Sequence, residues 1–160
     1  MALGARALER KNMFRGINFH NIDPKGRVSV PAKFREIARA DGSNGFMVTL
    51  MDGCLLGYPF SEWLKLEQRV LETPIKDDFF RRFRRTFIGG ASECPFDRQG
   101  RILLPPPQRL YAAIEKEVVF VGVTNHFEIW SREKWDEENE KMALDLKQED
   151  ARNQIAALGI

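Results

Sequence analysis

Two short stretches of the chain share one pattern of polar and apolar positions. Residues 23–31 begin with Asp-Pro-Lys-Gly, an order typical of a tight type I turn. Residues 27–30 then alternate polar and apolar, which predicts a half-buried strand. Pro31 ends the strand and can begin a helix, because the first helical residue needs no backbone donor. The pattern therefore predicts a turn, a strand and a helix, with Lys25 and Arg27 at the tip of a constrained loop.

The same pattern returns 74 residues later, at residues 97–105, which are Asp-Arg-Gln-Gly-Arg-Ile-Leu-Leu-Pro. In the segments that follow, Arg35 of the first copy corresponds to Arg109 of the second. Two segments that contain tryptophan, 58–63 and 130–135, match at an offset of 72 residues, so one loop of the second copy is shorter. An internal repeat sets the architecture. The sequence therefore predicts two copies of one small α+β module that share a core, because a module of about 60 residues is marginally stable alone.

Hydrophobic periodicity predicts the other elements. Strands are predicted at residues 17–22, 46–50, 54–58, 88–96, 117–123 and 127–130. Helices are predicted at residues 32–40, from Ser61 to a break at Thr73-Pro74, at 77–87, from Pro105 and from Ser131. Ser61 and Ser131 are the predicted N-caps, because a serine hydroxyl accepts a hydrogen bond from the first helical turn.

The segment 77–87 joins the two copies and has an aromatic stripe. Phe79, Phe83 and Phe87 recur every fourth residue, and arginines fill the positions between them. The simplest interpretation is that the stripe is core or subunit contact and that the arginines are solvated or paired with acids. Contact of these arginines with DNA is the alternative.

Aromatic residues are numerous on the short predicted helices. They are Trp63, Phe79, Phe80, Phe83, Phe87 and Trp135. We expect a 160-residue chain of paired modules to leave part of this surface unburied, and exposed apolar patches usually mark contact surfaces. The sequence therefore predicts an oligomer larger than a dimer.

Charge is unevenly distributed along the chain. The 160 residues are 43% hydrophobic and 30% charged, which is ordinary for a globular protein, and the net charge is +2. The last 30 residues hold five basic and eight acidic side chains, whereas the preceding 130 hold twenty basic and fifteen acidic ones. A basic body with an acidic tail favours a polyanionic partner for the body.

The sequence argues against several classes of protein. Cys54 and Cys94 are its only cysteines, so we expect no disulfide framework and a reducing cytoplasm. The leader, residues 1–12, lacks the apolar run of a signal peptide, and no segment approaches the roughly 20 apolar residues that span a bilayer. No Walker loop, nucleophile elbow or pair of catalytic carboxylates is recognisable, so we expect no enzyme.

The repeat places His20 level with Cys94, and Cys54 level with His126. This symmetry is compatible with a metal site, but neither Cys-x-x-Cys nor His-x-x-His spacing occurs. Packing in the interior or at a sheet edge is the favoured interpretation. We therefore expect no metal and no cofactor.

Three features together resemble one protein family. They are Phe-Arg-Gly at residues 14–16, the two Gly-Arg turns, and Asn-His-Phe-Glu-Ile-Trp at residues 125–130. From Met13 to about Leu144, the chain resembles the MraZ family of bacterial transcriptional regulators, which carry tandem AbrB-type (SpoVT-AbrB) domains. The leader 1–12 is extra to the family pattern, so Met13 is an alternative start.

The resemblance implies an α+β fold in which two tandem swapped-hairpin (AbrB-type) β modules form one pseudo-twofold barrel with flanking helices. It divides the chain into a leader (1–12), a first module (13–75), a linker helix (76–87), a second module (88–135) and an acidic helical tail (136–160).

The function implied by the resemblance is sequence-specific DNA binding. Such a regulator represses its own division and cell wall operon by binding short promoter repeats as a homo-oligomeric ring. It works in the cytoplasm, at the nucleoid, without a membrane or a small-molecule substrate. AbrB-type barrels also occur in antitoxins that mask a protein partner, which is the alternative function.

The two turns carry the predicted DNA contacts. A turn held by Asp and Gly fixes cationic side chains before they meet DNA, where arginine reaches phosphate or pairs with guanine. The resemblance assigns this role to Arg27 and Lys25. It supports Arg101 and Arg98 less strongly, because Gln99 stands where the first copy has its lysine.

Two alternatives stand beside this assignment. Asp23 with Arg27, and Asp97 with Arg101, are candidate internal ion pairs that would brace the hairpins. Arg15 either extends the basic edge beside the first strand or is simply solvated.

Overall fold

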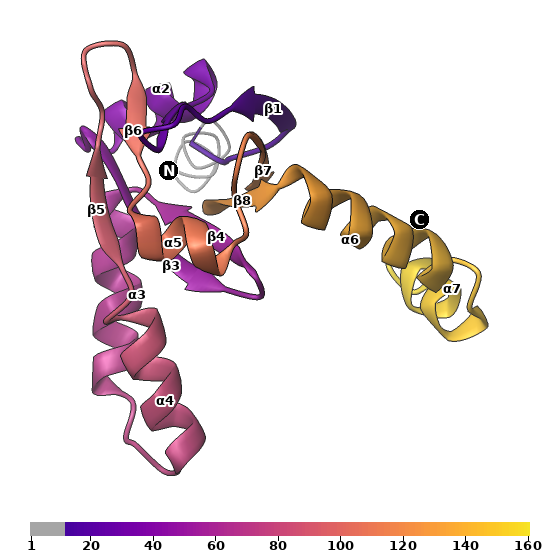
Figure 1. The fold of residues 1–160 in the computed structure, drawn as a ribbon. Coiled ribbons are helices and arrows are strands. Elements are labelled where there is room, and N and C mark those ends of the chain that lie inside the picture. Colours follow the sequence, from indigo (N-terminus) through magenta and orange to yellow (C-terminus); the bar gives the residue numbers. More distant parts are fainter. Residues whose placement is uncertain (1–11) are drawn as a thin grey trace, which may run out of the picture.

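A six-stranded sheet and a two-stranded ribbon form the centre of the fold in the computed structural model, which describes residues 12–160 (Figure 1). The predicted leader lies outside the described residues except for Asn12. The strands are β1 (Ile17–Asn21), β2 (Arg27–Ser29), β3 (Gly45–Met51), β4 (Cys54–Tyr58), β5 (Ser92–Pro95), β6 (Arg101–Leu103), β7 (Glu117–Val123) and β8 (His126–Ser131). The helices are α2 (Ala32–Ala40), α3 (Phe60–Glu72), α4 (Asp78–Phe87), α5 (Pro106–Tyr111), α6 (Arg132–Asp145) and α7 (Glu149–Ala156). Within this described part, no helix combines the length and the apolar character needed to cross a membrane.

The two halves of the chain interleave in the sheet. Its strand order is β1-β7-β8-β4-β3-β5, and all of its strand pairs are antiparallel. At one edge β1 of the first half pairs with β7 of the second, and at the other edge β5 of the second half pairs with β3 of the first. The duplicated strands thus occupy matching places on either side of the β4–β8 pair. The fold is a mixed α/β arrangement in which neither half completes the sheet alone.

The two serine caps that the sequence predicts have different outcomes. Ser131 caps α6 as predicted, because its hydroxyl accepts a hydrogen bond from the backbone N–H of Lys134 at 3.1 Å. The predicted cap at Ser61 is wrong. The N-cap of α3 is Pro59, whose fixed φ prepares the first turn, and Ser61 lies inside that turn with its N–H donating to Asp41.

The predicted strand 88–96 is shorter than expected. β5 covers only its last part, because helix-like hydrogen bonding continues beyond α4. The N–H of Gly90 donates to the carbonyl of Thr86 at 2.9 Å. Residues 88–90 therefore form a turn, and the strand begins after it.

The first core lies on one face of the sheet and is centred on Phe127. Its ring centroid is 4.7 Å from that of Phe46, 5.2 Å from that of Phe34 and 5.3 Å from that of Phe14. Gly57 lies against the same ring, and a Cβ atom there would collide with it. Side chains of both halves thus fill one core.

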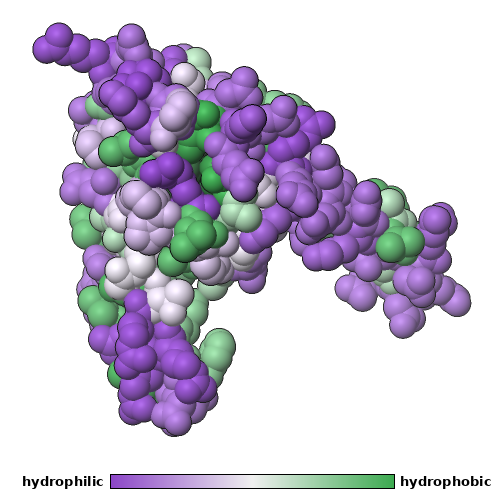
Figure 2. Space-filling view, in the orientation of Figure 1, coloured by the Kyte–Doolittle hydropathy of each residue, from purple (hydrophilic) through white to green (hydrophobic). Residues whose placement is uncertain are grey.

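The second core lies on the opposite face, under α3 and α4. Trp63 stacks on Phe87 with ring centroids 5.5 Å apart, and Phe87 stacks on Phe83 at 5.1 Å. Trp63 and Phe87 are only 2% and 4% exposed, so the fold buries these two members of the aromatic set. Phe79, in the first turn of α4, is 69% exposed, so part of the aromatic set stays unburied. Figure 2 shows mainly hydrophilic groups at the end of the arm that α3 and α4 form.

Candidate nucleic-acid interface

The first turn is held by the side chain of Asp23. One carboxylate oxygen accepts hydrogen bonds from the backbone N–H groups of Lys25 at 3.0 Å and of Arg27 at 2.8 Å. The N–H of Gly26 closes the turn on the carbonyl of Asp23 at 2.9 Å. Gly26 has a φ of 92°, which favours glycine at this position. Asp and Gly are thus needed to build the turn, and the basic residues are placed by it.

The second turn repeats these contacts. The carboxylate of Asp97 accepts from the N–H groups of Gln99 and Arg101, both at 2.9 Å. Gly100, with a φ of 76°, donates to the carbonyl of Asp97 at 3.1 Å. The sequence repeat is therefore also a repeat of turn geometry.

Each aspartate also pairs with the arginine that ends its turn. The Nε atom of Arg27 lies 2.6 Å from Asp23, and that of Arg101 lies 2.8 Å from Asp97. The backbone N–H groups of the two arginines, helped by these ion pairs, hold the pKa of both carboxyls below the ordinary value, so both stay ionised at neutral pH.

The bracing ion pairs use only the Nε atom of each arginine. The arginine side chains are 36% exposed for Arg27 and 27% for Arg101. Within residues 12–160, their terminal nitrogens make no hydrogen bond to the protein. Bracing and DNA contact are therefore compatible, because the pair uses Nε and orients the rest of the group.

The two turns come together through the ribbon of β2 and β6. Val28 and Ile102 pair at its centre and are buried. Arg27 and Arg101 lie on its other face as diagonal neighbours, with Cα atoms roughly 7–8 Å apart. The N–H of Leu104 donates to the carbonyl of Gly26 at 2.9 Å, and the equivalent bond joins the other two strand ends. The structure thus places both predicted arginines on one face.

Ser29 and Leu103 complete this outer face, and sequence reasoning missed both. Leu103 is the direct partner of Arg27, and Ser29 is the direct partner of Arg101. Leu103 is 54% exposed, so an apolar side chain lies on the outer face beside Arg27. The alternation in each strand indicated an outward position, but only the pairing of the strands shows which residues become neighbours.

Each turn is backed by an arginine from the other copy. Arg109 donates from Nε to the carbonyl of Leu104 at 3.0 Å and lies against Gly26, where a Cβ atom would be 2.9 Å from its guanidinium carbon. Arg35 supports the second turn, donating from Nη1 to the carbonyl of Val30 at 2.8 Å and lying against Gly100. The repeat showed that Arg35 and Arg109 correspond, but not that they support opposite turns.

We expect Arg109→Ala to weaken DNA binding more than Arg35→Ala does, although neither residue lies in a turn. Arg109 supports the turn that carries Lys25 and Arg27, the better supported of the two predicted contacts. Gel-shift titration of both variants measures the difference, and circular dichroism confirms that each is folded. A larger loss in Arg35→Ala would contradict the greater weight of the first turn in DNA binding.

The other predicted contacts divide into two groups. Lys25 and Arg98 are exposed at the tips of their turns, as expected. Arg15 is also exposed, but its backbone lies against Gly122, at the end of β1 remote from the first turn. The five residues of β1, about 16 Å in length, separate it from that turn. The structure therefore does not bring Arg15 to the ribbon.

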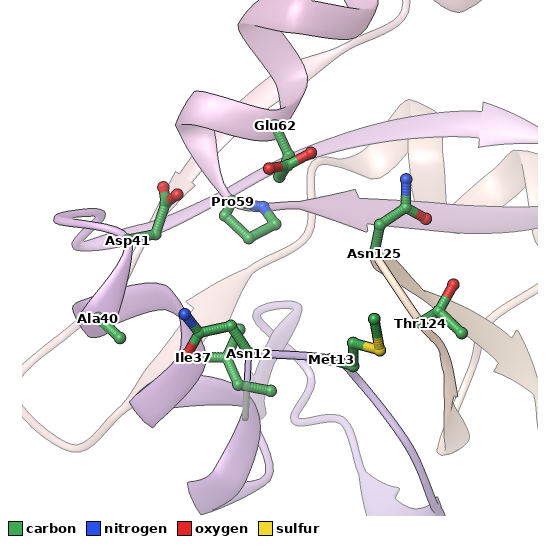
Figure 3. Close-up of a pocket in the computed structure, with 9 residues that line it drawn as sticks. All are labelled: Asn12, Met13, Ile37, Ala40, Asp41, Pro59, Glu62, Thr124 and Asn125. Carbon is green, nitrogen blue, oxygen red and sulfur yellow. The ribbon is translucent and has the colours of Figure 1, made fainter. Parts of the chain in front are cut away.

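A pocket of about 570 Å³ lies elsewhere, between α2, the start of α3 and the β7–β8 turn (Figure 3). Its described lining includes the carboxylates of Asp41 and Glu62 and no basic residue. Such a pocket repels phosphate. It is therefore not a candidate for nucleic-acid contact.

The histidine and cysteine pairs occupy separate environments. Cys54 and Cys94 are buried, which raises the pKa of both thiols, that of Cys94 to about 12. His126 stacks on Tyr58, and His20 meets Phe120 edge-on. Among residues 12–160, no cluster of three ligand-type side chains is placed to hold a metal ion.

Comparison with known proteins places the chain in a family. The family described as "MraZ protein, putative antitoxin-like" matches it twice, at residues 13–86 and 87–155. The transcriptional regulator MraZ of Desulforapulum autotrophicum is 51% identical over 148 residues, which are 92% of this chain and 100% of the relative. The protein of that name from Desulfosudis oleivorans is 46% identical over the same shares, and that from Natranaerobius thermophilus is 48% identical over 78% of this chain and 85% of its own. The chain therefore belongs to the MraZ family.

Proposed function

We propose that the chain is a DNA-binding transcriptional regulator that inserts the β2–β6 ribbon into the major groove. The observation that carries this proposal is the pair of half-buried arginines, Arg27 and Arg101, on the outer face of the ribbon, each oriented by an aspartate. The major groove admits a two-stranded β-ribbon, and arginine pairs with guanine there. Lys25 and Arg98 at the turn tips add phosphate contacts. The names of the relatives support the same function.

Family membership supports the finer features of the proposal. Two swapped-hairpin modules, 13–75 and 88–135, form one barrel, and copies of the chain close into a ring. The ring binds short promoter repeats and represses the division and cell wall operon that contains its own gene, in the cytoplasm at the nucleoid. Binding several repeats at once raises affinity by roughly 10²–10⁴ without any new contact.

The test is a gel shift that compares DNA from upstream of the protein's own gene with shuffled DNA of the same length. Specific regulators prefer their sites by roughly 10³ or more. We expect a preference of that order. Equal affinity for both fragments would contradict sequence specificity, and no binding to either would contradict the proposed function.

Promoter affinity is expected to fall steeply as salt rises. Each phosphate neutralised by a lysine or arginine releases counterions, and the logarithm of affinity then falls with the logarithm of salt by a slope of roughly −0.9 per contact. Fluorescence anisotropy between low and physiological salt measures this slope. A binding constant that does not change with salt would exclude phosphate contacts by the turns.

The protein is expected to form an oligomer larger than a dimer. Phe79 on α4 and Leu110 on α5 remain exposed, and surfaces of this kind commonly mediate contacts between copies. Light scattering at micromolar concentration measures the mass. A mass of one chain, 18.5 kDa, or of two chains would refute this expectation.

An antitoxin-like interaction module is the second candidate, which the description of the matched family favours. Such a module would mask a protein partner. Promoter DNA would then bind no better than shuffled DNA, so the same gel shift distinguishes the two functions.

A further inference from the structure

Two helical arms leave the β-sheet in different directions (Figure 1). One consists of α3 and α4, and the other consists of α6 and α7. The base of α6 is fixed to the sheet, where Trp135 meets Trp130 with centroids 6.3 Å apart. Beyond that contact the arms diverge, so α4 and α7 of one chain do not meet.

The surface of α4 is basic around an apolar groove. Arg81 pairs with Asp78 at 2.7 Å, but Arg82 and Arg85 make no ion pair with any described residue. Arg82 and the exposed Phe79, three residues apart on one helix face, both line a groove of about 260 Å³ between α4 and the β3–β4 hairpin. This face therefore offers positive charge beside an apolar hollow.

The second arm has the opposite charge and its own apolar surface. Glu137 and Glu140 are exposed on α6 and make no ion pair within the described part of the chain. Neither α6 nor α7 has a buried residue. The exposed apolar side chains of this region are Met142, Leu144, Leu146, Leu158 and Ile160. Figure 2 shows apolar groups among hydrophilic ones toward the end of this arm.

We propose that the α6–α7 arm of one copy docks on α4 of a neighbouring copy, with its acids on the arginines and its leucines at the Phe79 groove. The charges are complementary, both surfaces carry exposed apolar groups, and the two surfaces cannot meet within one chain. Because two different surfaces meet, the contact is head-to-tail, and such contacts close into rings when the rotation allows. The inference rests on the oligomer in the proposed function and not on DNA binding.

Charge reversal tests this contact without DNA. One variant combines Glu137→Lys with Glu140→Lys, and the other combines Arg82→Glu with Arg85→Glu. By light scattering at low salt, each variant alone should fall to a smaller mass than the wild type, because like charges then face each other. An equal mixture of the two should regain the wild-type mass, because each new arm now meets a helix of opposite charge. The control, Arg82→Lys with Arg85→Lys, should keep the wild-type mass.

Several outcomes would overturn the contact. They are a wild-type mass for either reversed variant alone, no recovery in the mixture, or a single-chain mass for the wild type. If a reversed variant loses its helical circular dichroism, carbodiimide crosslinking of mixed isotope-labelled and unlabelled wild-type protein decides instead. Crosslinks between chains should then join Lys76, just before α4, to carboxylates of α6 or α7, and their absence overturns the contact. If the variant with Arg82→Glu and Arg85→Glu keeps the wild-type mass but loses promoter binding, α4 contacts DNA and not the arm of a neighbouring copy.

The DNA-binding part of the proposed function is tested separately from the contact between arms. Arg27→Ala, which alters a turn and neither arm, should keep the wild-type mass. If promoter binding is absent while the mixture experiment succeeds, only the DNA-binding proposal falls.

Discussion

Arg27→Ala is expected to abolish specific DNA binding, whereas Arg101→Ala is expected to weaken it less. Both arginines end turns with the same hydrogen bonds, so the difference must come from their neighbours. Lys25 adds a second cation to the first turn, whereas Gln99 offers a neutral amide. Pro24 also fixes its own φ, so the first turn loses less entropy on binding.

The magnitudes separate loss of binding from loss of stability. A base-reading arginine contributes about 1–3 kcal/mol at each engaged site, and an oligomer on several repeats multiplies the loss. Arg27→Ala also removes the ion pair with Asp23, but an ion pair at the surface adds little to the stability of the fold. The variant should therefore stay folded while it loses its affinity for promoter DNA.

Gel-shift titration of both variants on one promoter fragment measures the asymmetry. Light scattering and circular dichroism must first show that each keeps the oligomeric state and fold of the wild type. Arg69→Ala, which removes an exposed arginine from α3, is the matched control and should bind as the wild type does. Equal losses in the two turn variants would contradict the asymmetry, and intact binding by folded Arg27→Ala would rule out the site.

Phe127→Ala is expected to cost about 3–5 kcal/mol in free energy of unfolding, the usual range for a buried phenylalanine. Its ring contacts Phe14, Phe34 and Phe46 and is fully buried at the centre of the first core. Gly57 lies against it and has no side chain that could fill the cavity. A loss of this size is a large part of the 5–15 kcal/mol typical of folded domains.

Urea unfolding at a fixed protein concentration measures this loss. Leu64→Ala is the control, because Leu64 lies on α3 and is 61% exposed, so its truncation should change stability by only about 0.5 kcal/mol. A Phe127→Ala midpoint as high as that of Leu64→Ala would show that the two halves do not share this core.

Sequence reasoning succeeded where the determining contacts are local. Asp23 and Asp97 bind N–H groups two and four residues further on, so the turn motif contains nearly everything that shapes it. Ser131 caps α6 through a bond to the third residue after it, which is equally local. The prediction of a strand at 88–96 was wrong in its first part. There the bond from Gly90 back to Thr86 extends the helical turns into a segment whose composition favours a strand.

The candidate site was only half predictable. Arg27 and Arg101 were found because each follows a recognisable turn. Leu103 was missed, because its place beside Arg27 depends on the pairing of two strands that are 74 residues apart in the repeat. The role of Arg109 was missed too, because it supports a turn in the other copy.

The duplication, the two turns and most of the helices and strands are readable along the chain, because hydrogen bonds over a few residues and periodic burial specify these features. Long-range packing, in contrast, sets how the copies interleave, the pairing of β2 with β6, and the crossing of Arg35 and Arg109 to opposite turns. It also buried Trp63 and Phe87 while it left Phe79 exposed. These outcomes depend on which distant surfaces together bury the most apolar area, and a pattern along one strand or helix does not contain that information.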